Sequence, residues 1–158
     1  METSGDNQTA PLARERQTLV RAADFLAAEV RRYDPAVQAH FLGNVCNLLV
    51  RFNILGGMFG VITITSDLSL SWRLRSYEVI PHTEWDRVQE LFAVQNARTT
   101  TARWFLATNS NEVQFAGECT LRGQPLRDKR QIRRCLLRPV ERMHRKIGRM
   151  FVERPPKR

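Results

Sequence analysis

The residues best suited to chemistry in this sequence are arginines near its C-terminus. They recur at spacings of three and four residues, which would align them on one face of a continuous helix as a ladder of guanidinium groups. Such a ladder suits nucleic-acid phosphates, an anionic membrane surface or an acidic protein segment. The ladder consists of Arg127, Arg130, Arg134, Arg138, Arg142, Arg145 and Arg149.

An alternative interpretation of the ladder is a solvated helix face whose charges only keep the protein soluble. Like charges four residues apart repel by roughly a few tenths of a kcal/mol per pair in an isolated helix. The ladder is expected to contain no interleaved Glu that would offset this repulsion. Both interpretations therefore stay open, and an external anion would bind to this face of the helix.

The charge of the chain supports a specialised C-terminal segment. The 158 residues carry 25 Lys and Arg against 16 Asp and Glu, and 14 of the bases but only 3 of the acids lie between Arg122 and Arg158. The preceding residues therefore hold 11 bases and 13 acids, so they are close to neutral. Any electrostatic function belongs to the C-terminal segment.

The sequence offers no recognisable catalytic constellation. The histidines, His40, His82 and His144, fall in separate predicted elements and lack the spacing of a zinc site. The serines fit no nucleophile elbow, the glycines fit no phosphate-binding loop, and the carboxylates are scattered. We therefore expect a protein that is not an enzyme and that has no catalytic residues, no metal and no cofactor.

The cysteines and the termini predict the compartment. Cys46, Cys119 and Cys135 form no CxxC pair, which is typical of small buried side chains in a reducing environment. The polar N-terminus does not resemble a signal peptide, and no apolar run approaches the roughly 20 residues of a transmembrane helix. We expect a cytoplasmic protein with no transmembrane segment.

The first half of the chain predicts two helices behind a disordered tail at residues 1–10. Apolar residues at helical spacing predict the first helix from Leu12 to about Arg32. After Asp34 and Pro35 a second helix is expected, running from Val37 until glycines 56 and 57 end it. Residues 45–55 also fit a buried strand, although the helix is favoured.

Strict alternation of apolar and polar residues predicts two hairpins in the rest of the chain. The first pairs residues 58–65 with 68–74, and the second pairs residues 100–107 with 113–121. A helix of about three turns is expected between them, beginning near Thr83. A last helix should begin near Leu126, and Pro139 should either kink it or open a new one.

Packing these elements together predicts the fold class α+β. The expected architecture is an antiparallel sheet built from two hairpins and covered by helices. Its element order would be helix, helix, hairpin, helix, hairpin, helix. We expect one domain over residues 11–151, followed by a basic tail at 152–158.

Three aromatic residues are candidates for contact with a protein partner: Trp72, Trp104 and Phe105. Trp72 lies on the apolar face of the first hairpin, which is more typical of a core position. Trp104 and Phe105 are adjacent in a predicted strand and therefore point to opposite faces of the sheet. One of them must be covered by a helix, a second subunit or a ligand.

A resemblance to a known family is carried by residues 83–147. Its features are a short helix ending at Asn96, a strand over residues 102–106, a second strand over 112–121 and Gly123 before an amphipathic helix. This order resembles the YbjN-type family of bacterial proteins, which share a fold with type III secretion chaperones. The resemblance implies a non-enzymatic α/β sandwich, often a homodimer, that binds segments of other proteins or acts in regulation. The strong positive charge and the second N-terminal helix depart from that pattern.

The sequence therefore predicts a non-catalytic interaction module, chaperone-like or regulatory, that binds a protein segment. The competing hypothesis is an RNA-binding or DNA-binding protein that uses the arginine ladder. No helix-turn-helix or RNA-recognition signature predicts base-specific readout. Peripheral association with a membrane through the same ladder is a third alternative.

Overall fold

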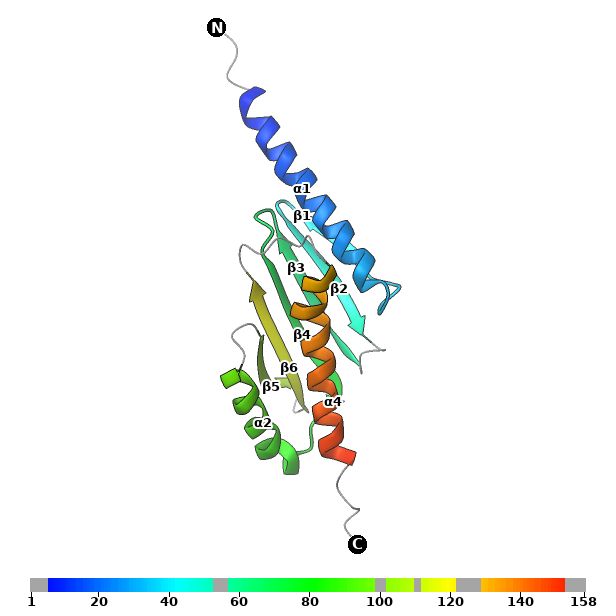
Figure 1. Cartoon of the computed structure of the whole chain (residues 1–158), viewed down its shortest axis with the longest axis vertical. Coiled ribbons are helices and arrows are strands. Elements are labelled where there is room, and N and C mark those ends of the chain that lie inside the picture. Colours follow the sequence, from blue (N-terminus) through cyan, green and yellow to red (C-terminus); the bar gives the residue numbers. More distant parts are fainter. Residues whose placement is uncertain (1–5, 53–56, 99–101, 110–111, 122–128, 153–158) are drawn as a thin grey trace.

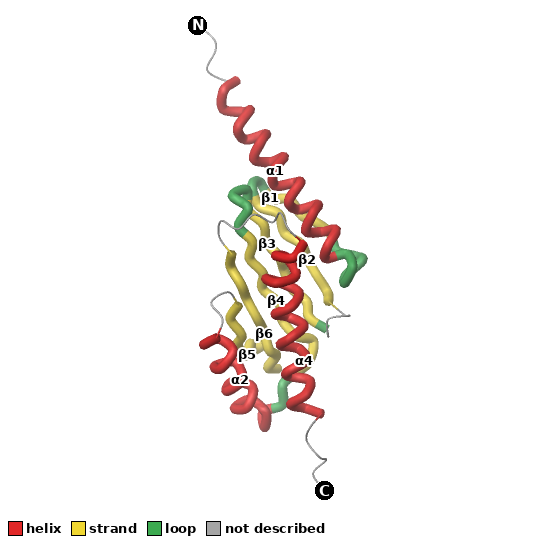
Figure 2. Tube along the Cα trace, viewed as in Figure 1, coloured by secondary structure: helices red, strands yellow, loops and turns green. Residues whose placement is uncertain are grey.

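A computed structural model describes residues 6–52, 57–98, 102–109, 112–121 and 129–152. Over these residues the chain folds into one antiparallel sheet of six strands, in the order β1-β2-β3-β4-β6-β5. The described helices lie on one face of the sheet (Figure 1). The fold is thus α+β, as predicted, but helices cover only one side of the sheet (Figure 2).

The chain runs from one helix through four strands, a second helix and two further strands to the C-terminal helical segment. The strands are β1 (Gln38–Leu42), β2 (Val45–Phe52), β3 (Met58–Thr65), β4 (Leu70–Val79), β5 (Ala102–Asn109) and β6 (Glu112–Leu121). The helices are α1 (Asp6–Val30), α2 (Trp85–Arg98), α3 (Lys129–Ile132) and α4 (Arg138–Val152). A 3-10 turn, η1 (His82–Glu84), precedes α2, and a π turn, η2 (Arg133–Leu137), joins α3 to α4.

The first helix has the buried face that its sequence predicts. Leu19, Ala23, Leu26 and Val30 are fully buried, and α1 contacts β1, β2 and β3. The helix begins at Asp6, inside the segment that was expected to be a disordered tail. Residues 13–18 are exposed because this part of α1 projects beyond the sheet (Figure 1).

The prediction of a second helix from Val37 is wrong, because residues 38–52 form the hairpin of β1 and β2. Buried Cys46, Leu48, Val50 and Phe52 alternate in β2 with more exposed side chains, and Leu49 is 55% exposed. The apolar residues also fit helical spacing, so periodicity alone could not decide. Pairing with β3 decides it, since only a strand buries every second residue against the core.

Two local features hold this hairpin in place. Gly43 has a φ angle of 60° between the two strands, which most other residues adopt only under strain. The carboxylate of Asp34, a buried residue, accepts hydrogen bonds from the backbone N–H groups of Ala36 and Arg51, at 3.1 and 2.8 Å. Asp34 therefore links the segment that follows α1 to strand β2.

Both predicted hairpins are present. β3 pairs with β4, and the carboxylate of Asp67 in their turn accepts hydrogen bonds from the Thr65 hydroxyl and the Ser69 N–H. These bonds, that of Thr65 foremost, lower the pKa of Asp67. β5 pairs with β6, and β6 inserts between β4 and β5. The predicted helix between the hairpins is α2.

The core fills the space between the sheet and the helices. Trp72, Leu74 and Phe115 from the strands are fully buried, together with Val140 and Ile147 of α4. α4 lies across the middle of the sheet (Figure 2). The helix that was expected to begin near Leu126 starts, within the described residues, at Lys129 and is divided by η2.

Candidate anion-binding cleft

A hydrogen bond from β4 reaches the backbone just before α4 begins. In an α-helix the N–H of residue 139 would donate to the carbonyl of Cys135, but Pro139 has no N–H. The indole N–H of Trp72 donates to this carbonyl instead, at 3.0 Å. The Cys135 carbonyl lies in the π turn that precedes α4. Trp72 therefore supplies the donor that Pro139 cannot provide.

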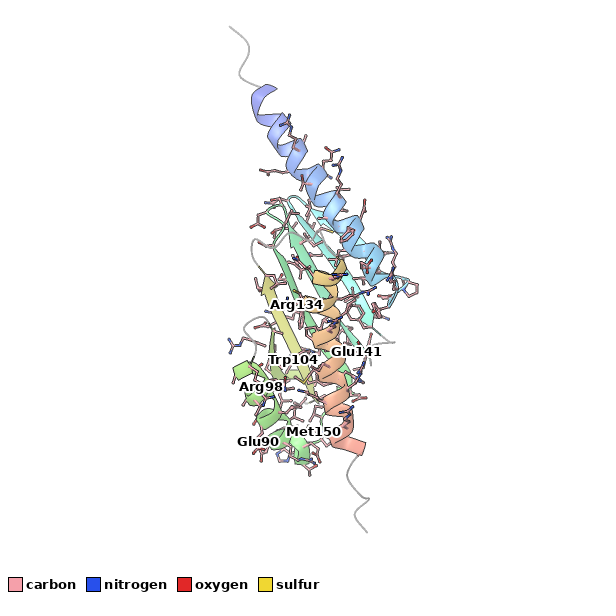
Figure 3. The ribbon with its side chains drawn as sticks, in the orientation of Figure 1. Glu90, Arg98, Trp104, Arg134, Glu141 and Met150 are labelled. Carbon is pink, nitrogen blue, oxygen red and sulfur yellow. The ribbon has the colours of Figure 1, made fainter. Side chains whose placement is uncertain are left out.

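A cleft of about 390 Å³ has α4 on one side. Its other side is formed by the edge strand β5 and by the helix α2. Figure 3 shows Trp104 of β5 and Arg134 of η2, which both line it. The remaining lining residues are Gln95 and Ala102 on the sheet side and Arg138, Pro139, Arg142, Met143 and Lys146 on the α4 side.

The α4 side of the cleft is strongly cationic. Arg134, Arg138, Arg142 and Lys146 follow one another at four-residue spacing, so they form one stripe along the cleft. Among the described residues that line the cleft, none is acidic. The cleft thus combines a cationic wall with an apolar floor, where Trp104 is 4% exposed.

The predicted ladder borders two depressions on this helix, the cleft and a shallow hollow of about 320 Å³ on the outer side of α4. Arg134 lines only the cleft, Arg145 and Arg149 line only the hollow, and Arg138 and Arg142 line both. Arg130 is exposed in α3. Arg127 lies outside the described residues, as does Gly123.

One expectation about the ladder needs correction. Glu141 lies among the arginines and forms an ion pair with Arg145. The carboxylate is one turn before the guanidinium, which is the favourable order for a helical pair. Glu141 therefore offsets part of the repulsion on the outer side of α4, but it does not line the cleft.

The three candidate aromatic residues occupy different environments. Trp72 is 2% exposed, so its ring is part of the core and its N–H is engaged by Cys135. Trp104 is also buried, against Trp72 with the ring centroids 5.9 Å apart, and it forms the floor of the cleft. Phe105 is 38% exposed on the opposite face of the sheet.

Asn96 fixes the edge strand that forms one side of the cleft. Its side-chain amide donates to the backbone carbonyl of Trp104 at 2.9 Å and accepts from the backbone N–H of the same residue at 2.8 Å. At this one residue the two bonds satisfy backbone groups that an edge strand leaves without a partner strand. The residue singled out by the family resemblance thus positions Trp104.

Sequence reasoning missed two residues of the cleft. Lys146 continues the stripe four residues after Arg142, and its spacing was a usable signal that attention to arginines alone overlooked. Gln95 belongs to α2, and only the tertiary structure brings it to α4. No local pattern predicts that juxtaposition.

The cysteines are poorly suited to nucleophilic chemistry. Burial, with a smaller effect of nearby Cys135, raises the pKa of Cys119 to about 11. Burial also raises the pKa of Cys46 and of Cys135. At neutral pH these thiols are protonated and therefore unreactive. Within the described residues, no cluster of His, Cys, Asp and Glu could hold a metal ion.

Comparison with known proteins identifies the fold. No family model matches the chain, and no curated protein matches its sequence. The crystal structure of YbjN from E. coli, described as a proposed transcription regulator, superposes with a TM-score of 0.53 at 11% sequence identity. The match covers 81% of this chain and 92% of YbjN. The predicted YbjN-like fold is therefore confirmed. Among the described helices, none has the length and apolar character needed to span a membrane.

Proposed function

We propose that this protein is a non-catalytic interaction module that binds an acidic segment of a protein partner in the cleft beside α4. The observation that carries the proposal is the stripe of four cations that lines the cleft without an acid among the described lining residues. The role assigned to YbjN, as a proposed transcription regulator, supports a regulatory interaction rather than catalysis.

The floor of the cleft favours a peptide over a bare phosphate. Trp104 and Met143, which are 4% and 2% exposed, form the apolar floor together with the half-buried Pro139. A segment in which Asp or Glu alternates with leucine or phenylalanine would match both parts, since its carboxylates reach guanidinium groups while its apolar side chains cover the floor.

Electrostatics provides a driving force for this binding. Cations at four-residue spacing repel in the free helix, by roughly a few tenths of a kcal/mol per pair. A bound carboxylate removes the repulsion and adds charge-assisted hydrogen bonds. Because the cleft walls exclude part of the solvent, these bonds are screened less than those on the open outer side of α4.

The test is the affinity of a short labelled peptide, rich in Glu with interspersed Leu, measured by fluorescence anisotropy. The double variant Arg138→Glu and Arg142→Glu should weaken binding by roughly tenfold or more, since it removes two charge-assisted contacts. The matched control is Arg16→Glu with Arg21→Glu, which makes the same charge change on an exposed part of α1.

The control separates a site from a general charge effect. The α1 variant should retain the affinity to within a small factor, because only long-range screened attraction is lost. Equal losses in both variants would show that the peptide responds to net charge alone. An unchanged affinity in the α4 variant would contradict the proposal.

A second candidate function is nucleic-acid binding along the outer side of α4. The supporting observation is the exposure of Arg145 and Arg149 beside Lys146 in the outer hollow. If about five phosphates are neutralised, log affinity should fall with log salt at a slope of about −4 to −5. A shallow slope for duplex DNA would argue against this second function.

A further inference from the structure

The face of the sheet opposite the helices carries its own set of exposed side chains. In each strand every second residue points to this face, and the described helices all lie on the other one (Figure 1). Large hydrophobic side chains are exposed here: Leu49 is 55% exposed, Tyr77 43% and Phe105 38%. Aromatic and aliphatic side chains exposed together on one sheet face suggest a binding function.

Strand register places rings and guanidinium groups in one row across this face. Arg51 of β2 lies opposite Phe59 of β3, and Phe59 lies opposite Arg75 of β4. Arg75 in turn lies opposite Ala116 of β6, and Ala116 lies opposite Phe105 of β5. The row crosses five strands, a distance of roughly 19 Å at the usual strand spacing.

The neighbouring row adds more positive charge. Arg73 of β4 and Arg103 of β5 both lie opposite Glu118 of β6, and Arg73 forms an ion pair with Glu118 at 3.3 Å. The Arg73 side chain is still 79% exposed. These two rows together contain four arginines and one carboxylate, that of Glu118. The middle of the sheet face is therefore cationic.

Phe59 lies between two hollows on this face. One, of about 570 Å³, is bordered by Leu49 and Arg51, and the other, of about 510 Å³, by Arg73 and Arg75. Phe59 also contacts the exposed ring of Tyr77, with the centroids 4.8 Å apart. Each hollow thus offers an aromatic surface beside at least one guanidinium group.

We propose that this sheet face binds single-stranded nucleic acid. Flat rings on a sheet stack unpaired bases, and guanidinium groups between them bind the phosphates and stack in their turn. The row supplies both elements: Arg51 and Arg75 flank Phe59, and Phe105 follows beyond Ala116. The proposal concerns a surface other than the α4 cleft and is independent of the peptide site.

The charge and shape of the face argue against other occupants. In a symmetric face-to-face dimer the same patch meets itself, which would bring the arginine-rich middle against an identical set. In a duplex the bases are stacked on one another, so they cannot also stack on Phe59 and Phe105. A single strand offers both negative charge and free aromatic faces.

The test uses a labelled oligothymidylate of about 12 nucleotides, which forms no secondary structure, with fluorescence anisotropy in low salt. Phe105→Leu keeps an apolar side chain but removes the ring, and it should weaken binding roughly 5- to 100-fold. Arg51→Gln with Arg75→Gln should weaken binding and flatten its salt dependence. Circular dichroism and thermal unfolding confirm that each variant is folded.

One control variant, measured with both ligands, makes the outcome decisive. Arg138→Glu with Arg142→Glu, on the helical side, should leave oligothymidylate affinity within a few-fold of the unmodified protein. If the same variant keeps its affinity for the acidic peptide, the peptide site in the α4 cleft is contradicted. The sheet-face proposal is not affected by that result. Three results would overturn the sheet-face proposal: no binding in low salt, unchanged affinity for Phe105→Leu, or a loss confined to the α4 variant.

Discussion

Replacing Gly117 by alanine is expected to lower the free energy of unfolding by about 1–3 kcal/mol. A Cβ atom at this position in β6 would lie 2.6 Å from Cζ3 of Trp104 and 2.7 Å from its Cε3. The ring cannot easily yield, since it packs against Trp72 in the core. Urea denaturation followed by circular dichroism measures the change.

A second glycine provides the control for this prediction. Gly148 lies within α4, and a Cβ added there would meet no atom within 4 Å. Gly148→Ala should therefore raise the free energy of unfolding by about 0.5–1 kcal/mol, through helix propensity and lower entropy of the unfolded chain. A Gly117→Ala protein as stable as the unmodified one would show that Trp104 does not pack on β6 as described.

Trp72→Phe is expected to destabilise the protein by about 1–3 kcal/mol through the unsatisfied carbonyl of Cys135, in addition to the effect of the lost volume. The indole N–H is the donor that replaces the missing N–H of Pro139. Thermal unfolding should report the loss as a lower Tm, by roughly 2–4 °C per kcal/mol for a chain of this size.

A double-mutant cycle isolates the hydrogen bond from the packing effect. Pro139→Ala restores a backbone N–H that can donate to the Cys135 carbonyl when η2 relaxes toward an α-helix. The cost of Trp72→Phe should then be smaller by about 1 kcal/mol in the Pro139→Ala background. Strictly additive effects would mean that Trp72 and Pro139 do not share this carbonyl.

Much of the fold is predictable because its signals are local. The β3-β4 hairpin is specified by strict alternation and by the Asp67 turn, and α1 by the spacing of Leu19, Ala23 and Leu26. The β1-β2 hairpin cannot be predicted in this way, because the spacing of its apolar residues fits both a helix and a strand. The pairing of β2 with β3, a non-local interaction, decides between them.

The candidate site shows the same division between local and non-local signals. The stripe from Arg134 to Lys146 follows from helical spacing, which the sequence displays directly. The opposite wall does not, because Gln95 and Trp104 reach α4 only through the strand order, in which β6 separates β4 from β5. The row on the other sheet face likewise depends on register, which period-two patterns do not specify.

The two proposals place different partners on opposite sides of one sheet. The α4 side would bind an acidic protein segment, while the uncovered side would bind a single nucleic-acid strand. Because the core between them is continuous, neither site would need to open for the other to be occupied.

Hydrogen–deuterium exchange with and without the Glu- and Leu-containing peptide tests binding at the α4 cleft most directly. We predict slower exchange in Arg134–Lys146 and in β5, with the β2-β3 pair unchanged, because the peptide covers only the cleft walls. Protection confined to β2, β3 and β4, or a pattern identical with and without saturating peptide, would contradict an acidic-segment site beside α4.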